Sequence, residues 1–387
     1  MRLIRTVVLA TAALIATSST AEAQNPEIYV PNYGDLTVTV LDAVTLMTLG
    51  PPIPILPPVS PDCPASGNPD AVQFTLDHLF AFVSIDNCDQ LAVIDTITRN
   101  VNFIPVLPSA LETRIFRRPQ GDRMYLNSCG RSNIEVISVA TQAVIGVILV
   151  PGSYPMAFSP NGKIGYAGNG FVGGCETPMS GIHRLDLAAN TVAGFISTSR
   201  DVAQMAVHPS GGAALTTGAD DRILVVNLGT NMEVGPVMCG IVPCAYGATF
   251  GLTFNAEGTR AYVLDFGGGF LVTLDTTNPL SPQELSRTPL PPIGTAFQLV
   301  RSGTRLYVLL SDSPSRVVVF DISSDPPALL PGAGTAGLDA FEIDVWPLVS
   351  ADQCKKGGWQ AGGFKNQGQC VSSMNSKGKM GERKGQK

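Results

Sequence analysis

An eight-residue pattern recurs seven times along the chain, and this repetition limits the fold more than any other feature. The pattern is an apolar run that ends on a short polar residue, as in LAVIDTIT (91–98). Repeats of forty to fifty strand-like residues are typical of β-propellers, in which each blade has four antiparallel strands. The polar residue recurs at Asp42, Asp95, Ser138, Asp186, Asn227, Asp275 and Asp321, at intervals of 53, 43, 48, 41, 48 and 46 residues.

Two further positions keep the same register and predict a hairpin in each repeat. A turn residue lies upstream of the polar position, and a large apolar residue follows it four residues later. The turns are at His78, Gly121, Gly162, Gly211, Gly258 and Gly303, and the large residues are Phe82, Tyr125, Tyr166, Leu215, Tyr262 and Tyr307. We expect the large side chain to pack between neighbouring sheets. The polar residue is expected to bind backbone N–H groups in the following turn, because a catalytic acid repeated in five equivalent copies is implausible.

The two ends of the repeat array are complementary. The first repeat has a second strand at Glu27–Val30 but no inner strand before it, and DAFEIDVWP (339–347) reads as an inner strand with no partner after it. Pairing the two segments removes the open ends of the array. The sequence therefore predicts an all-β, seven-bladed propeller in which the C-terminal strand pairs with the first blade.

The N-terminus has the three-part layout of a secretory signal peptide. Arg2 and Arg5 precede an apolar stretch, and Ala21-Glu22-Ala23 forms a small-residue cleavage site. We expect residues 1–23 to be removed, and the mature protein to be exported to the periplasm or the medium, or to the cell surface. No later stretch has the roughly 20 apolar residues of a membrane span.

Charge divides the mature chain into two parts. Residues 24–351, the predicted propeller, contain 15 basic and 28 acidic residues, whereas residues 352–387 contain 8 basic and 2 acidic residues. An acidic body argues against nucleic acid as the main partner, because nucleic acid requires a basic surface. The C-terminal segment is predicted to be a separate small module, bracketed by Cys354 and Cys370, followed by a disordered end.

Segments such as RSGTRLYVLLSDSPSRVVVFDIS (301–323) and SPNGKIGYAGN (159–169) resemble the YVTN repeat of bacterial and archaeal propellers. This superfamily includes surface-layer proteins, lactonase-like propellers and the heavy chain of quinoprotein amine dehydrogenases. The resemblance implies a propeller over residues 27–347, but it does not imply one activity, because the motif describes blade packing. The C-terminal module resembles a short element at the ends of otherwise unrelated exported bacterial proteins.

The eight cysteines are even in number and fit disulfide pairing in an exported protein. We expect Cys239 to pair with Cys244 and Cys354 with Cys370. Cys63, Cys88, Cys129 and Cys175 allow three pairings. Cys63–Cys88 with Cys129–Cys175 is preferred, because these bonds join loops of the same or adjacent blades.

The loops that join second to third strands, and those between blades, should emerge on one face around the axis. That face would carry the candidate ligand-binding residues Asp86, Asp89, Asp220, Asp221, Asp265 and Asp312. Several carboxylates around one axis can chelate a hard cation such as Ca²⁺. The alternative is that Asp is simply a residue that short loops favour. The identity of any metal stays unknown.

Motifs for catalysis are missing from the sequence. The three histidines have no metal-site spacing, G-x-S-x-G is absent, and Gly332–Gly337 matches a dinucleotide fingerprint without the helix that it needs. The main hypothesis is a secreted, non-catalytic, monomeric binding or surface-associated scaffold without a cofactor, whose partner is an unknown protein or envelope polymer. The alternative hypothesis is a lactonase-like hydrolase that uses loop-face carboxylates, with Ca²⁺. A redox-partner subunit like the quinoprotein heavy chain is a third hypothesis.

Overall fold

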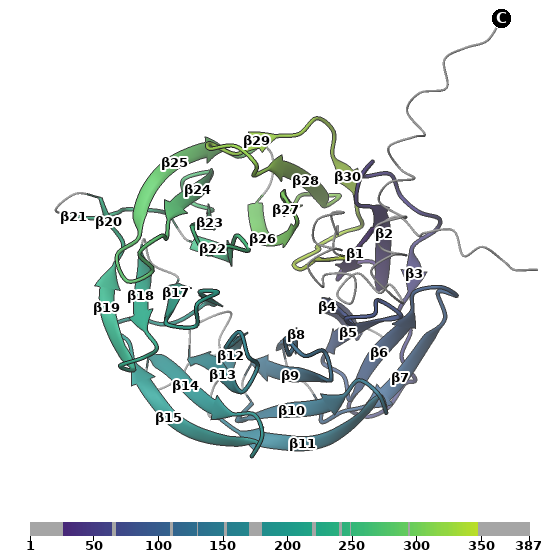
Figure 1. The fold of residues 1–387 in the computed structure, drawn as a ribbon. Coiled ribbons are helices and arrows are strands. Elements are labelled where there is room, and N and C mark those ends of the chain that lie inside the picture. Colours follow the sequence, from purple (N-terminus) through teal and green to yellow (C-terminus); the bar gives the residue numbers. More distant parts are fainter. Residues whose placement is uncertain are drawn as a thin grey trace, which may run out of the picture.

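Seven largely antiparallel sheets surround a central axis in the computed structural model (Figure 1). The structure describes residues 26–346 apart from 64–66, 109–110, 130, 151–152, 170–179, 219–221, 240–241, 248 and 293–294. The predicted seven-bladed, all-β propeller is confirmed. The predicted signal peptide and C-terminal module lie outside the described residues. Among the described segments, none is a helix with the length and apolarity needed to cross a membrane.

Each blade is a sheet whose strands follow one another from the axis outward. The first three blades are β31 (Asp344–Val345), β1 (Glu27–Asn32), β2 (Thr37–Asp42) and β3 (Ile53–Pro54); β4 (Asn68–Phe74), β5 (Phe80–Asp86), β6 (Gln90–Asp95) and β7 (Val101–Pro105); and β8 (Leu111–Arg117), β9 (Arg123–Cys129), β10 (Asn133–Ser138) and β11 (Ala143–Leu149). The fourth and fifth are β12 (Ser153–Phe158), β13 (Ile164–Asn169), β14 (Gly181–Asp186) and β15 (Thr191–Ser197); and β16 (Gln204–Val207), β17 (Ala213–Thr217), β18 (Ile223–Asn227) and β19 (Met232–Pro236).

The last two blades carry additional short strands. The sixth is β22 (Thr249–Phe254), β23 (Arg260–Asp265), β24 (Phe270–Asp275) and β25 (Gln283–Pro289), extended at its outer edge by β20 (Met238–Cys239) and β21 (Val242–Pro243). The seventh is β26 (Thr295–Ser302), β27 (Arg305–Ser311), β28 (Arg316–Asp321) and β29 (Ala328–Leu329), with β30 (Gly334–Thr335) also paired to β28.

The repeated positions have the roles that the sequence predicts. All six turn residues have a positive φ, from 58° to 77°, and His78 is the one that is not glycine. Every polar anchor accepts a backbone N–H bond of 2.7–3.2 Å in the turn that follows it. The large second-strand residues are at most 3% exposed and pack between sheets. The blades therefore owe their repeat to turn geometry and inter-sheet packing.

The ring closes through the C-terminal strand, as the sequence predicts. Ile28 pairs with Val345 and Tyr29 with Asp344, and the Trp346 N–H donates to the Glu27 carbonyl at 2.8 Å. In Figure 1 the purple first blade lies beside the yellow-green end of the chain. The pairing is shorter than the expected segment 339–347. In the described part of that segment, strand geometry covers Asp344 and Val345.

Side chains strengthen this short pairing. Asp344 Oδ2 accepts hydrogen bonds from Gln73 Nε2 at 2.5 Å and from Phe74 N at 2.8 Å, both in the second blade. Trp346 stacks on the His78 ring, with centroids 4.8 Å apart. Burial, helped by repulsion from Arg117, lowers the pKa of His78 to about 3, so a neutral imidazole packs there.

Asp344→Ala should lower the free energy of unfolding by about 2–3 kcal/mol, because it leaves the buried Phe74 N–H and the partly buried Gln73 amide without an acceptor. The matched control is Asp62→Ala, which changes an exposed aspartate and should stay within about 0.5 kcal/mol of the parent. Urea unfolding of both variants measures this difference. Equal midpoints for the two variants would show that Asp344 does not hold the ring closed.

The anchor acids should make the fold sensitive to acid. Backbone N–H bonds hold the pKa values of Asp95, Asp186, Asp275 and Asp321 below the usual aspartate range. A lowered folded-state pKa means stability that is present above the unfolded value of about 3.9 and lost as pH falls through the folded value.

Replacing all four residues by Asn, the residue found at position 227, keeps the turn acceptor and removes the titration. Between pH 5 and pH 2 the urea midpoint of this variant should fall less than that of the parent. Parallel decreases in the two proteins would contradict the assignment.

Candidate functional site

The predicted loop-face acids divide into those that the structure places and those that it does not describe. Asp220 and Asp221 lie outside the described residues. Asp86, at the end of β5, is buried, and its Oδ1 accepts the N–H of Thr113 in the next blade at 2.8 Å. Asp89 Oδ1 accepts the Ser60 hydroxyl at 3.0 Å. Both carboxylates thus bind neighbouring segments of the propeller.

Asp265 is bound by two backbone N–H groups and faces an arginine. It lies fully buried at the end of β23, where Oδ1 accepts the N–H groups of Gly247 at 2.6 Å and Gly268 at 2.8 Å. Its Oδ2 lies 3.6 Å from Arg287 Nη1 on β25. The two bonds to Oδ1 fix the loop that precedes the blade, whereas Oδ2 is buried without a hydrogen-bond partner among the described residues.

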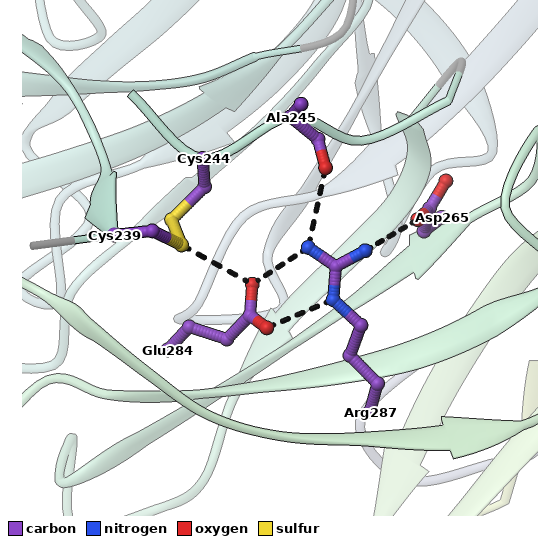
Figure 2. Close-up of a disulfide and its surroundings, with 6 residues drawn as sticks. All are labelled: Cys239, Cys244, Ala245, Asp265, Glu284 and Arg287. Atoms are coloured by element: carbon purple, nitrogen blue, oxygen red, sulfur yellow. Dashed lines mark hydrogen bonds and ion pairs between the residues drawn. A yellow bond between two sulfur atoms is a disulfide. The ribbon is translucent and has the colours of Figure 1, made fainter. Parts of the chain in front are cut away.

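Arg287 connects Asp265 to a surface disulfide, as Figure 2 shows. Its Nε lies 2.8 Å from Glu284 Oε1, and its Nη2 donates to the Ala245 carbonyl at 3.2 Å. Cys239 Sγ is 3.8 Å from Glu284 Oε2. The Glu284 carboxylate raises the pKa of Arg287, so this guanidinium stays charged.

Tyr246 completes this cluster. The Arg287 guanidinium lies over its ring, 5.0 Å from the centroid. Burial, followed by the negative charge of Glu284, raises the pKa of the Tyr246 hydroxyl well above its usual range. A neutral ring under a charged guanidinium is a stable cation–π arrangement. These contacts connect the disulfide-closed loop to β23 and β25, and the buried Tyr246 hydroxyl has no hydrogen-bond partner among the described residues.

Asp312, at the end of the seventh blade's second strand, is bound by Arg316. Arg316 Nε donates to Asp312 Oδ2 at 2.6 Å, and Nη2 also contacts that oxygen. Each of the four described acids therefore binds another group of the propeller. They are Asp86, Asp89, Asp265 and Asp312.

The groups of side chains that lie close enough together to bind a metal ion differ from the acids that the sequence suggests. Within the described part of the chain, three ligating side chains come close enough together at Cys63–Cys88–Asp89 and at Cys239–Cys244–Glu284. In both groups the two sulfurs form a disulfide, so they cannot act as thiolate ligands. Neither group brings two of the predicted acids together.

Two of the expected disulfides are present, Cys63–Cys88 and Cys239–Cys244. The first joins the loop before β4 to the loop between β5 and β6, and both of its cysteines are buried. The second closes the β20–β21 hairpin. The remaining predicted pairs, Cys129–Cys175 and Cys354–Cys370, depend on side chains outside the described residues.

A cavity of about 280 Å³ lies on the axis and was not singled out from the sequence. Its wall includes residues from the inner strands of all seven blades. The polar and charged ones are Gln73, Arg114, Gln204, Thr253, Gln298, Arg301, Glu342 and Asp344. The available signal was a set of charged and amide residues inside predicted inner strands, where apolar residues would otherwise be expected.

Ion pairs cross one side of this cavity. Arg114 Nη1 lies 2.9 Å from Glu342 Oε1 and 3.3 Å from Asp70 Oδ1. Burial raises the pKa values of Glu342 and Asp344, while Arg114 and Arg117 respectively oppose that shift. Arg301, on β26, has a buried Nε without a hydrogen-bond partner, and burial lowers its pKa. The cavity on the axis is therefore lined by polar groups. Several of its charged side chains bind the C-terminal segment, as Arg114 binds Glu342.

Comparison with known proteins supports the fold and no particular family. No protein-family model matches the sequence, and neither does any curated protein. A chain of the solved structure titled Kuenenia stuttgartiensis hydrazine synthase is similar in structure, with a TM-score of 0.59 and 16% sequence identity. The match covers 72% of this chain and 92% of that chain. At this identity, the likeness shows the propeller fold alone.

Removing the two disulfides should destabilise the fold unequally. Loop-closure entropy gives about 3–4 kcal/mol for Cys63–Cys88, which spans 25 residues, and about 2 kcal/mol for Cys239–Cys244, which spans 5. Double Cys→Ala variants of each pair, unfolded in guanidinium, measure the two losses. A larger loss for the Cys239–Cys244 pair would show that strain or local contacts outweigh chain entropy.

Proposed function

We propose that this chain is an exported, non-catalytic propeller of the YVTN-repeat type that acts as a binding or surface-associated scaffold. The leader-like N-terminus, the YVTN-like segments and the two disulfides support this proposal. The basic module at 352–387 would assist display or retention at the cell envelope.

The observation that carries the proposal is how the loop-face acids are used. Asp265 is held by two backbone N–H groups and Arg287, Asp312 by Arg316, and Asp86 by Thr113 N. A hydrolytic centre needs a carboxylate that is free to move a proton or hold a cation near substrate. Carboxylates that already hold loops in place favour a rigid surface for binding.

The first test measures turnover by the full mature protein on a panel of aliphatic and sugar lactones, with and without EDTA. We expect no hydrolysis above the buffer rate. Hydrolysis that EDTA abolishes and that Asp312→Asn weakens, with an unchanged melting temperature, would establish the lactonase-like alternative in place of the scaffold.

The second test concerns the C-terminal module. Cells that express the full chain and a chain ending at residue 351 are fractionated, and the protein is quantified in periplasm, envelope and medium. We expect the shortened chain to move from the envelope to soluble fractions. The same distribution for both chains would remove the retention role from the proposal.

A further inference from the structure

A second cavity, about 660 Å³ in volume, lies on the opposite end of the hairpins from the loop-face acids. The turns between β8 and β9 and between β12 and β13 contribute Arg118 and Lys163 to it, and β14 contributes Arg184. Aliphatic side chains lie among these cations, namely Ile164, Ala188 and Ala193. This volume lies within the usual range of small-molecule sites. We call these six residues the basic groove.

The charge of the basic groove contrasts with that of the rest of the propeller. Residues 24–351 carry a net charge of −13, and Lys163 is the sole lysine among them. Several of the arginines that the structure describes form ion pairs between blades, as Arg99 does with Glu27 and Arg114 with Glu342. A cluster of cations in an acidic body is a local exception, and it attracts anions from short range.

Two carboxylates lie at the basic groove, Asp186 in the cavity lining and Asp122 beside Arg118, and they offset part of its charge. Asp122 is half exposed and is shared by two guanidinium groups, with Arg118 Nη1 at 3.4 Å and Arg123 Nε at 3.8 Å. Asp186 Oδ1 accepts the N–H groups of Ala188 at 2.9 Å and Ala189 at 3.0 Å. The cavity lining itself therefore contains three cations and one acid, Asp186, and the exposed Lys163 forms no ion pair within the described residues.

We propose that the basic groove binds an amphipathic organic anion, a carboxylate or phosphate monoester on a short apolar body. The anionic group would lie against Arg118, Lys163 and Arg184, and guanidinium groups suit it because they bind two oxygens at once. The apolar body would cover Ile164, Ala188 and Ala193. The proposal rests on the proposed binding function, to which it adds the class of ligand.

Isothermal titration of the full mature protein with octyl phosphate tests the proposal. Octanoate is the carboxylate probe, octyl glucoside has the same tail without charge, and inorganic phosphate has the charge without a tail. Octyl phosphate, below its micelle concentration, should bind about tenfold more tightly than either control, and added salt should weaken it. Equal affinity for octyl glucoside, or no binding of either anion, would overturn the proposal.

Lys163→Gln should weaken octyl phosphate binding about three- to tenfold, because a cation next to the anionic group is lost. The matched control is Gln283→Glu, on the outer strand of the sixth blade, which changes the net charge by the same amount at an exposed position. Both variants should melt with the parent. Indistinguishable affinities for the two variants would place the anion elsewhere and overturn the proposal.

Two further outcomes would separate failure of the groove proposal from failure of the scaffold proposal. Binding to phosphatidylglycerol vesicles without binding of monomeric octyl phosphate would identify a membrane surface as the ligand, and would overturn the groove as a single-anion site. Lactone turnover in the same preparation would contradict the non-catalytic scaffold, whatever the groove binds. The absence of anion binding alone would leave the scaffold in place.

Discussion

Ring closure at the axis is the constraint on which the other contacts depend. Without a fourth strand, β1 would present unpaired N–H and C=O groups to the interior, where their burial is costly. The two residues of β31 satisfy few of these groups, so side chains must supply the rest of the closure. Asp344 reaches the second blade and Glu342 reaches Arg114 in the third, so the end of the chain joins three blades.

This closure also determines what the axis contains. Glu342 and Asp344 are buried carboxylates, and their raised pKa values reflect the cost of that burial. Arg114 offsets the charge of Glu342, so the cavity wall there consists of groups that hold the ring together. Changing them to probe ligand binding would also change stability. Surfaces away from the axis are better placed to vary with function, because blade packing does not depend on them.

The sequence predicted the features that recur within each blade. Positions such as Gly162 and Asp95 act through neighbours two to five residues away, so their spacing alone was enough to assign a turn residue and an anchor acid. The ring closure was predictable for a related reason, since an incomplete first repeat requires a strand from elsewhere.

The site was less predictable because its contacts cross between blades. Asp265 has a loop-like position in the sequence, and only the fold shows that Arg287 and the Gly247 N–H bind it. Arg118 and Lys163 are far apart in the sequence, and they meet because equivalent hairpin turns of adjacent blades lie side by side. No spacing rule within one repeat could have assigned that pair.

Rigidity connects these observations to binding. The closed ring, the Cys63–Cys88 disulfide and the anchored turns hold the loops in place before any ligand arrives. A preorganised surface loses little conformational entropy on binding, so its affinity depends on the charges and apolar atoms that it presents. In an acidic propeller, an exposed basic side chain without an ion pair among the described residues, such as Lys163, is then well placed to select an anionic partner.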